Sequence, residues 1–222
     1  MQTEVLMRHR VRIMYAAILV ATVLLIVLPL AAQSTSQRTN EQRQALLNAH
    51  KTDFDYLLGD WEFTGTNRQY GKFRGYWSAA RLGDGAQLVD EYRVVGDNAE
   101  TYYVTYTVRS YNASLDRWEL VGIDTGSGLQ NIGTGHRDPD EVRIEQKFGV
   151  GTPNASTWRI RYYNIRPDGF SWSADRSTDE GRTWTNGFQQ LEVHRIGPPR
   201  TIGPLTSPKK VPAPGSAPPA HF

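Results

Sequence analysis

Between residues 53 and 196, apolar and polar side chains alternate with a period of two along most of the chain. In 101–108, for example, the even positions are Tyr, Val, Tyr and Val, and three of the four odd positions are Thr. The segments 142–148, 158–162 and 170–173 alternate in the same way. This pattern is typical of half-buried β-strands, because successive side chains of a strand point to opposite faces. It predicts about ten strands of roughly 6–10 residues, with no helix among them.

Clusters of glycine, proline, asparagine and aspartate separate these segments at regular intervals. They lie at 83–85, 96–98, 112–114, 138–140, 167–169 and 177–184. Such clusters are typical of tight turns. A meander of this many short strands removes its exposed edges most simply by closing on itself. The sequence therefore predicts an all-β fold, an antiparallel β-barrel, over residues 53–196.

The two ends of the chain differ from this central stretch. Residues 33–52 combine a polar spacer with a short helix that begins near Asn40 and runs through Ala49, with Leu46 and Leu47 as a weak apolar face. Asparagine is a favourable residue at a helix start. Residues 197–222 hold eight of the twelve prolines. That composition predicts a disordered, extended tail.

The segment 1–32 has the order of an export signal. Arg8, Arg10 and Arg12 precede an apolar run from Ile13 to Leu28, and small residues follow at 31–32. Basic, then apolar, then small residues are typical of a secretory signal peptide, and the run also approaches the length that spans a bilayer. Residues 1–32 are therefore either a cleaved signal or a retained membrane anchor. Both place the domain outside the cytoplasm, in the periplasm or at the cell surface.

Charge and cysteine content exclude several classes of function. The net charge of +2 comes from the ends, because residues 33–196 hold 19 basic and 22 acidic residues. A domain of this balance lacks the basic surface that binds nucleic acid, so we expect no nucleic-acid partner. The chain has no cysteine. That excludes disulfides, thiolate catalysis and cysteine-ligated metals.

One string, Ser177-Thr178-Asp179-Glu180-Gly181-Arg182-Thr183-Trp184, resembles the Asp-box of sialidases and other β-propellers. A propeller would repeat its blade unit. This string occurs once in the chain, so we interpret it as a hairpin that leads into the last strand. Asp179 is expected to accept backbone N–H bonds, Gly181 to take a positive φ, and Trp184 to cover the turn.

The segment Phe54–Phe63 (FDYLLGDWEF) resembles the FDFxxGxWxV opening of a bacterial family of uncharacterised exported proteins. Three further stretches fit that family in order: 89–92, 110–124 and 168–184. Leu57 stands where the family often has an aromatic residue. The resemblance implies a calycin-like, that is lipocalin-like, barrel, in which Trp61 closes one end. More distantly the layout is similar to nitrobindins, which are haem-binding barrels.

This distant resemblance implies a haem alternative through His194 in the last strand. The alternation around it points His194 towards solvent, and we expect no cofactor. His50 and His136 have no partner at metal-ligand spacing in the sequence, so no metal site is predicted.

Ligand-binding candidates come from polar and aromatic residues within strands. If such groups face the interior, they orient a ligand in an apolar cup. The candidates are Glu91, Arg93, Tyr106, Asp124, Trp158 and Trp172. The many aromatic residues either fill the barrel or line a cavity, and the sequence leaves both open.

Three functions follow from these alternatives. The leading one is a non-enzymatic domain that binds a small apolar or amphipathic ligand in the barrel. The second is a hydrolase or isomerase that uses strand carboxylates such as Glu91 or Asp124. The third is a structural envelope adaptor with a filled barrel. The chain has no nucleophile or metal motif that assigns a catalytic residue.

Overall fold

The structure is a computed structural model that describes residues 38–83 and 85–203. It contains the α-helix α2 (Asn40–His50) and a short 3-10 helix, η1 (Asp55–Leu57). The strands are β1 (Gly59–Asn67), β2 (Gly71–Leu82), β3 (Leu88–Val95), β4 (Thr101–Asn112), β5 (Arg117–Asp124), β6 (Gly128–Arg137), β7 (Val142–Phe148), β8 (Ser156–Arg166), β9 (Gly169–Ser177), β10 (Thr185–Gly197) and β11 (Arg200–Ile202). The helix after Asn40 and the strand meander are thus confirmed. Within the described ranges, no helix is long and apolar enough to span a membrane. The predicted signal or anchor lies outside the described residues.

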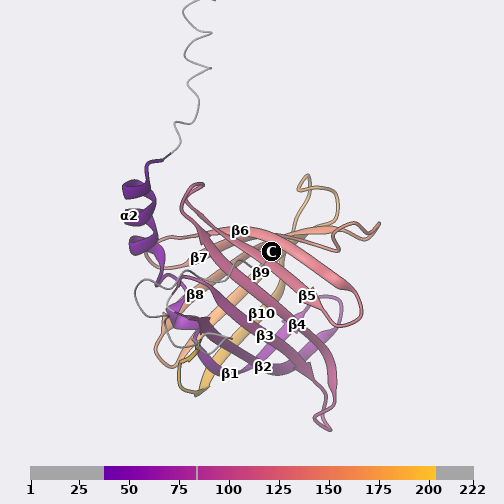
Figure 1. The fold of residues 1–222 in the computed structure, drawn as a ribbon. Coiled ribbons are helices and arrows are strands. Elements are labelled where there is room, and N and C mark those ends of the chain that lie inside the picture. The colour runs from indigo at the N-terminus through magenta and orange to yellow at the C-terminus, as the bar shows by residue number, and fades with distance from the viewer. Residues whose placement is uncertain (1–37, 84, 204–222) are drawn as a thin grey trace, which may run out of the picture. The chain divides into compact units, whose positions relative to one another are not determined.

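Ten strands close into an antiparallel barrel (Figure 1). Each strand from β1 to β9 pairs with the next, and β10 pairs back onto β1, with Phe63 opposite Val193. Because all ten strands have two neighbours, none of them leaves an unpaired edge to solvent. The all-β antiparallel barrel expected from the sequence is confirmed.

The eleventh strand continues the line of β1 along β2. Gly59 pairs with Ala79 of β2, and Arg200 of β11 pairs with the next residue, Ala80, in parallel orientation. Arg200 also donates two hydrogen bonds to the carboxylate of Asp60, at 2.7 and 2.6 Å. The prediction of an irregular tail from residue 197 is therefore wrong for residues 200–202, where backbone pairing outweighs the loop-like composition.

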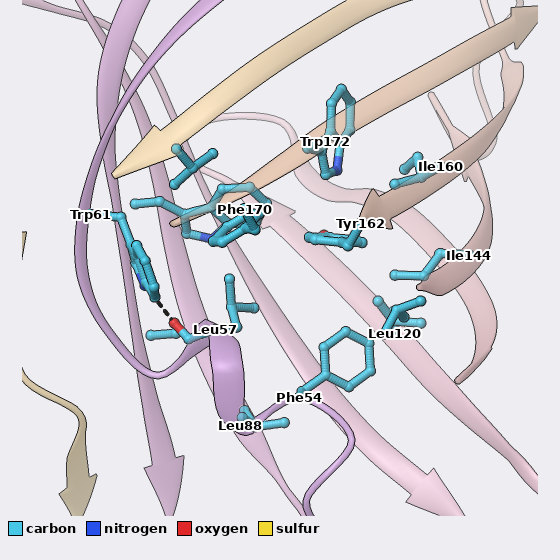
Figure 2. Close-up of a cluster of buried hydrophobic side chains, with 14 of the residues drawn as sticks. Phe54, Leu57, Trp61, Leu88, Leu120, Ile144, Ile160, Tyr162, Phe170 and Trp172 are labelled. Atoms are coloured by element: carbon cyan, nitrogen blue, oxygen red, sulfur yellow. Dashed lines mark hydrogen bonds between the residues drawn. The ribbon is translucent and has the colours of Figure 1, made fainter. Parts of the chain in front are cut away.

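The η1 segment closes the barrel at the end where β1 begins. The indole N–H of Trp61 donates to the carbonyl of Leu57 at 2.7 Å (Figure 2). The guanidinium of Arg195 lies 3.8 Å from the centre of the Trp61 ring and donates to the carbonyls of Leu58 and Tyr56, at 2.7 and 3.2 Å. These contacts fix η1 across the barrel end. They give Trp61 the structural role that its position predicted.

Aromatic rings fill the interior next to η1. Phe54 and Leu57 point from this segment into the barrel, towards Tyr162 and Phe170 (Figure 2). The ring centres of Phe54 and Trp118 lie 4.8 Å apart, edge to face, as aromatic pairs prefer. In this half of the barrel, the aromatic residues act as a plug. The fully or almost fully buried members of this cluster include Phe54, Leu57, Trp61, Phe63, Trp77, Leu88, Trp118, Leu120, Tyr162 and Phe170.

In the middle of strand β4, the polar residues face the barrel interior and the apolar residues face outward, the reverse of what the hydrophobic pattern predicts. Thr105, Thr107 and Arg109 are buried, whereas Tyr106 and Val108 are 40% and 38% exposed. The rule that the apolar set faces the core is thus wrong for this strand. The reason is that the barrel interior supplies polar partners at this level, including a carboxylate for Arg109. Buried polar groups are tolerated when such partners satisfy them.

The turn between β9 and β10 is held by Asp179. Its carboxylate accepts hydrogen bonds from the backbone N–H and the hydroxyl of Thr183, at 2.9 and 2.6 Å. These bonds, with the hydroxyl of Thr183 the strongest cause, lower the pKa of Asp179 to about 2. Gly181 has a φ of 87°, and the Trp184 indole donates to its carbonyl at 2.9 Å. Asp179, Gly181 and Trp184 therefore have structural roles in the turn.

Candidate functional site

The barrel interior contains a buried ion pair between neighbouring strands, on the side next to η1. Asp90 of β3 and Arg109 of β4 face inward, and the guanidinium Nε donates to the carboxylate Oδ2 at 2.7 Å. Their side chains are only 1% and 3% exposed. The other carboxylate oxygen accepts from the indole N–H of Trp77 at 2.9 Å, and Arg109 Nη2 donates to the Tyr162 hydroxyl at 3.4 Å. A charge at this depth is stable only with such partners.

The surroundings keep Arg109, Tyr56 and Tyr162 each in one protonation state. Burial acts to lower the pKa of Arg109, but the charge of Asp90 and its hydrogen bond outweigh burial and raise that pKa, so Arg109 stays cationic. Burial is also the main cause that raises the pKa of Tyr56 and of Tyr162. Both phenols therefore stay neutral, and their hydroxyl groups keep the ability to donate.

Two polar atoms of this group have no hydrogen-bond partner among the described residues. They are Nη1 of Arg109 and the hydroxyl of Tyr56, and both are buried. Tyr56 lies on η1, within electrostatic reach of Arg109 and Asp90, and its ring packs edge to face on Tyr162 at 6.0 Å between ring centres. Buried donors in proteins are nearly always satisfied by protein, water or ligand. These two groups can therefore donate to an oxygen of a bound molecule.

A second polar group lies towards the opposite end of the barrel from η1. A β-bulge in the β5–β6 pairing leaves Gln130 without an opposite residue. Its side-chain amide oxygen accepts hydrogen bonds from the hydroxyl of Thr105 at 2.9 Å and from the side-chain amide of Asn131 at 3.0 Å. Bulges re-aim side chains in this way. Gln146 of β7 donates to Asn131 at 2.8 Å, and Gln130 also contacts the hydroxyl of Tyr103. This end of the interior is thus lined by amides and hydroxyls.

Solvent reaches several inward-facing rings at this second end. Tyr103, Phe148 and Trp158 are partly exposed, although their strands direct them to the same side as buried neighbours. The pKa of Tyr103 is raised, mainly by burial and against the lowering effect of its bond with Gln130. The barrel thus has a plugged end at η1 and a more polar, partly accessible end opposite it.

The six predicted ligand-binding residues divide between the two faces of the barrel. Trp158 and Trp172 face inward, and Trp172 is buried. Asp124 ends β5 opposite the inward-facing Thr105 and acts electrostatically on Tyr103, so it lies at the accessible end.

The other three residues lie on the outer face, so the expectation that they contact a ligand inside the barrel is corrected. Strand β3 points Asp90 inward, and its neighbour Glu91 therefore points outward. Glu91 binds Arg93 at 2.8 Å on that face, and Tyr106 is opposite Glu91 on β4. An interior enzyme site that uses Glu91 is excluded by the same geometry.

Sequence reasoning missed Asp90, Arg109 and Tyr56. The available signal was the alternation itself, since Asp90 lies two residues from Tyr92 and Arg109 two residues from Tyr111. In each strand, a charged and an aromatic residue thus share one face. Tyr56 had no such signal, because η1 has no strand period.

The histidines lie outside this group. His194 is exposed on the outer face of β10, as the alternation predicted, so haem ligation by His194 would occur outside the barrel. His50 binds Asp53 at 2.9 Å and stacks on Tyr111, with 4.9 Å between ring centres. Among the residues described, no group of three or more His, Asp or Glu side chains could hold a metal ion.

No protein-family model and no curated protein matches the chain. Among solved structures, the crystal structure of Rv2717c from M. tuberculosis is similar at 16% identity with a TM-score of 0.46, over 68% of this chain and 97% of that one. The structure of EF1p2_mFAP2b bound to DFHBI is similar at 15% identity with a TM-score of 0.32, over 66% and 98% of the two chains. The barrel assignment therefore rests on the strand pairing of this chain.

Proposed function

We propose that the barrel binds a small amphipathic molecule whose carboxylate, sulfonate or carbonyl oxygen accepts hydrogen bonds from Arg109 and Tyr56. The observation that carries this proposal is the pair of buried donors, Arg109 Nη1 and the Tyr56 hydroxyl, that have no described partner. A non-catalytic role is favoured because the buried carboxylate, Asp90, is already bound by Arg109 and Trp77. A carboxylate held in this way is poorly placed to take a proton from a substrate.

The character of the ligand follows from the residues between this pair and the accessible end. Aromatic rings of Tyr92, Tyr103 and Trp158 alternate there with hydroxyl and amide groups of Thr105 and Gln146. Ligand sites commonly combine apolar walls with a few polar groups that orient the bound molecule. This lining suits a compact, ring-bearing acid better than a long alkyl chain, because amides interrupt the apolar walls.

The proposal includes an exported location and a family. The basic, apolar and small residues of 1–32 support export, as a cleaved signal or as an anchor. The FDYLLGDW segment supports membership of the exported calycin-like family that it resembles. Proteolysis of spheroplasts, whose outer membrane has been opened, tests the location in cells that express the full chain, because an exported domain that stays with the cell is cut while a cytoplasmic control protein is protected.

Two fluorescent probes with the same ring system test the ligand proposal. Anilinonaphthalene sulfonate carries a sulfonate, whereas N-phenyl-1-naphthylamine has the same rings without it. We expect saturable binding of the sulfonate probe, about tenfold or more tighter than the neutral probe, because hydrogen bonds to a charged group contribute about 1.5–3 kcal/mol. Equal affinity for both probes, or no saturable binding of either, would contradict the assigned donors.

Apolar surface outside the barrel must be excluded as the place where the probe binds. The outer-face variant Ile132→Glu serves as the control, because Ile132 is 43% exposed and points to the outside of the barrel, whereas its neighbour Asn131 points inward. Unchanged affinity of this variant for the sulfonate probe is expected for binding inside the barrel. A large loss would place the probe on the outer face instead.

A further inference from the structure

The outer face of β4, β5 and β6 carries a continuous group of exposed apolar side chains. Strand pairing places Tyr106 beside Ile123 and Ile123 beside Leu129 in one row. A second row contains Val108, Val121 and Ile132, again as directly paired residues. These six residues, called here the outer apolar face, are 38–49% exposed each.

Two other strands of the barrel carry polar side chains in the equivalent outward positions. On β7, which adjoins β6, these are Arg143, Glu145 and Lys147, and on β1, away from this sector, they are Glu62, Thr64 and Thr66. The outer apolar face is therefore confined to one sector of the barrel. It is the same sector in which β4 turns threonines and Arg109 inward. Contiguous exposed apolar surface of this kind marks an interaction site.

We propose that this face binds the same face of a second copy of the chain, forming a symmetric homodimer. Branched and aromatic residues in two parallel rows suit face-to-face packing of two β-sheets, in which side chains interdigitate. From the exposed fractions, the six residues present about 500 Å² of surface, and with the flanking polar residues the area approaches the about 800 Å² per partner of a standard stable interface.

The charges around the outer apolar face support a second copy as the partner. Glu91 and Arg93 flank it on β3, and Glu145 and Lys147 flank it on β7. Each side therefore carries one acidic and one basic residue close together. A surface with both signs on each side can complement itself in a two-fold arrangement. An anionic membrane or a nucleic acid would instead favour one sign, which this rim does not show.

Cysteine cross-linking in cells tests the proposal on the full chain. The chain has no cysteine, so a single introduced thiol reports one contact without background from the protein itself. Val121 lies between Val108 and Ile132 in the middle of the face, and Val121→Cys is a small change at an exposed position. Mild oxidation of cells that express Val121→Cys should convert most of the protein to a disulfide-linked dimer. Thr64→Cys, on the outer face of β1, should stay monomeric.

A second pair of variants shows whether the dimer depends on the apolar face. Ile132→Glu introduces a carboxylate opposite Lys147, and Thr66→Glu introduces one opposite Lys72 on the β1–β2 side of the barrel. Both place an acid beside a base on an exposed strand, so both should fold. Added to Val121→Cys, Ile132→Glu should reduce the cross-linked product to the level of Thr64→Cys, and Thr66→Glu should leave it unchanged.

Three results would overturn the proposal. Val121→Cys could remain monomeric, or it could link to a different protein, which mass spectrometry of the product would identify. Equal effects of Ile132→Glu and Thr66→Glu would show that the apolar face does not hold the dimer. Because no residue of the outer apolar face belongs to the proposed ligand site, these results are independent of ligand binding.

Discussion

Removing one member of the Asp90–Arg109 pair is expected to destabilise the barrel far more than removing both charges. In Arg109→Met, the carboxylate of Asp90 stays buried, with only the Trp77 N–H as a described side-chain donor. In Asp90→Asn, the buried guanidinium loses its counter-charge. Breaking a buried pair from one side costs about 3–5 kcal/mol. For a chain of this size, that cost corresponds to a melting temperature lower by about 10 °C.

The double variant Asp90→Asn/Arg109→Met removes both charges together. The amide oxygen of the new Asn can still accept from Trp77, and the Met side chain can pack where the guanidinium lies 5.0 Å from the Phe54 ring centre. Replacing a buried pair by neutral groups of similar size is often close to neutral. We therefore expect the double variant to lose about 1 kcal/mol, which gives a coupling energy of several kcal/mol.

Urea denaturation followed by tryptophan fluorescence measures all four proteins of this cycle. The exposed pair Arg117–Glu119 serves as the control, with both side chains at least 40% exposed. Its coupling should stay below about 1 kcal/mol, as for other surface pairs. Additive losses in the double variant, or single losses below about 1 kcal/mol, would refute the view that the pair is a coupled buried unit.

Three further substitutions test other parts of the fold. Asp179→Ala should lower the melting temperature at pH 7. Because the folded pKa of about 2 lies below the unfolded value of about 3.9, the difference from wild type should vanish as the pH falls from about 4 to about 2. Arg195→Ala should cost about 2–3 kcal/mol in urea denaturation, because charged hydrogen bonds and a cation–π contact at the barrel end are lost. A loss within about 0.5 kcal/mol, which is usual for neutral surface substitutions, would contradict this clamping role. Gly75→Ala should destabilise by about 1–3 kcal/mol, because an added Cβ would overlap the carbonyl oxygen of Arg93. Gly203→Ala is its control, since a Cβ there meets no atom within 4 Å and the melting temperature should stay unchanged.

The barrel could be predicted from the sequence because the signals for its strands and turns each lie within a short segment of the chain. Period-two alternation, regularly spaced turns and a single hairpin string specify strands and short connections without knowledge of their neighbours. The string at 177–184 is a clear case, since the bonds of Asp179 join residues four positions apart. Strand β11 was missed because its pairing with β2 depends on residues far away in the chain, while its own composition is typical of a loop.

The interior site could be predicted only in part. Whether a strand residue points inward depends on its contacts with distant residues as well as on the alternation of the sequence. Trp158 and Trp172, which were candidates only on the condition that they face the interior, do point inward. Glu91 and Tyr106, candidates on the same condition, point outward, since the polar residues of β4 face inward and bind Asp90 of β3 and Gln130 of β6. A sequence pattern states which residues share a face, and the long-range partners decide which face is buried.

The most direct test of the proposed function is to measure stability and ligand affinity together in Tyr56→Phe. The substitution removes only a buried hydroxyl that has no described partner, so the free energy of unfolding should be unchanged or slightly higher. The affinity for anilinonaphthalene sulfonate should fall by about tenfold, since one hydrogen bond to the charged group is lost. Unchanged affinity, or a loss of stability with no loss of affinity, would contradict the claim that this hydroxyl binds a ligand inside the barrel.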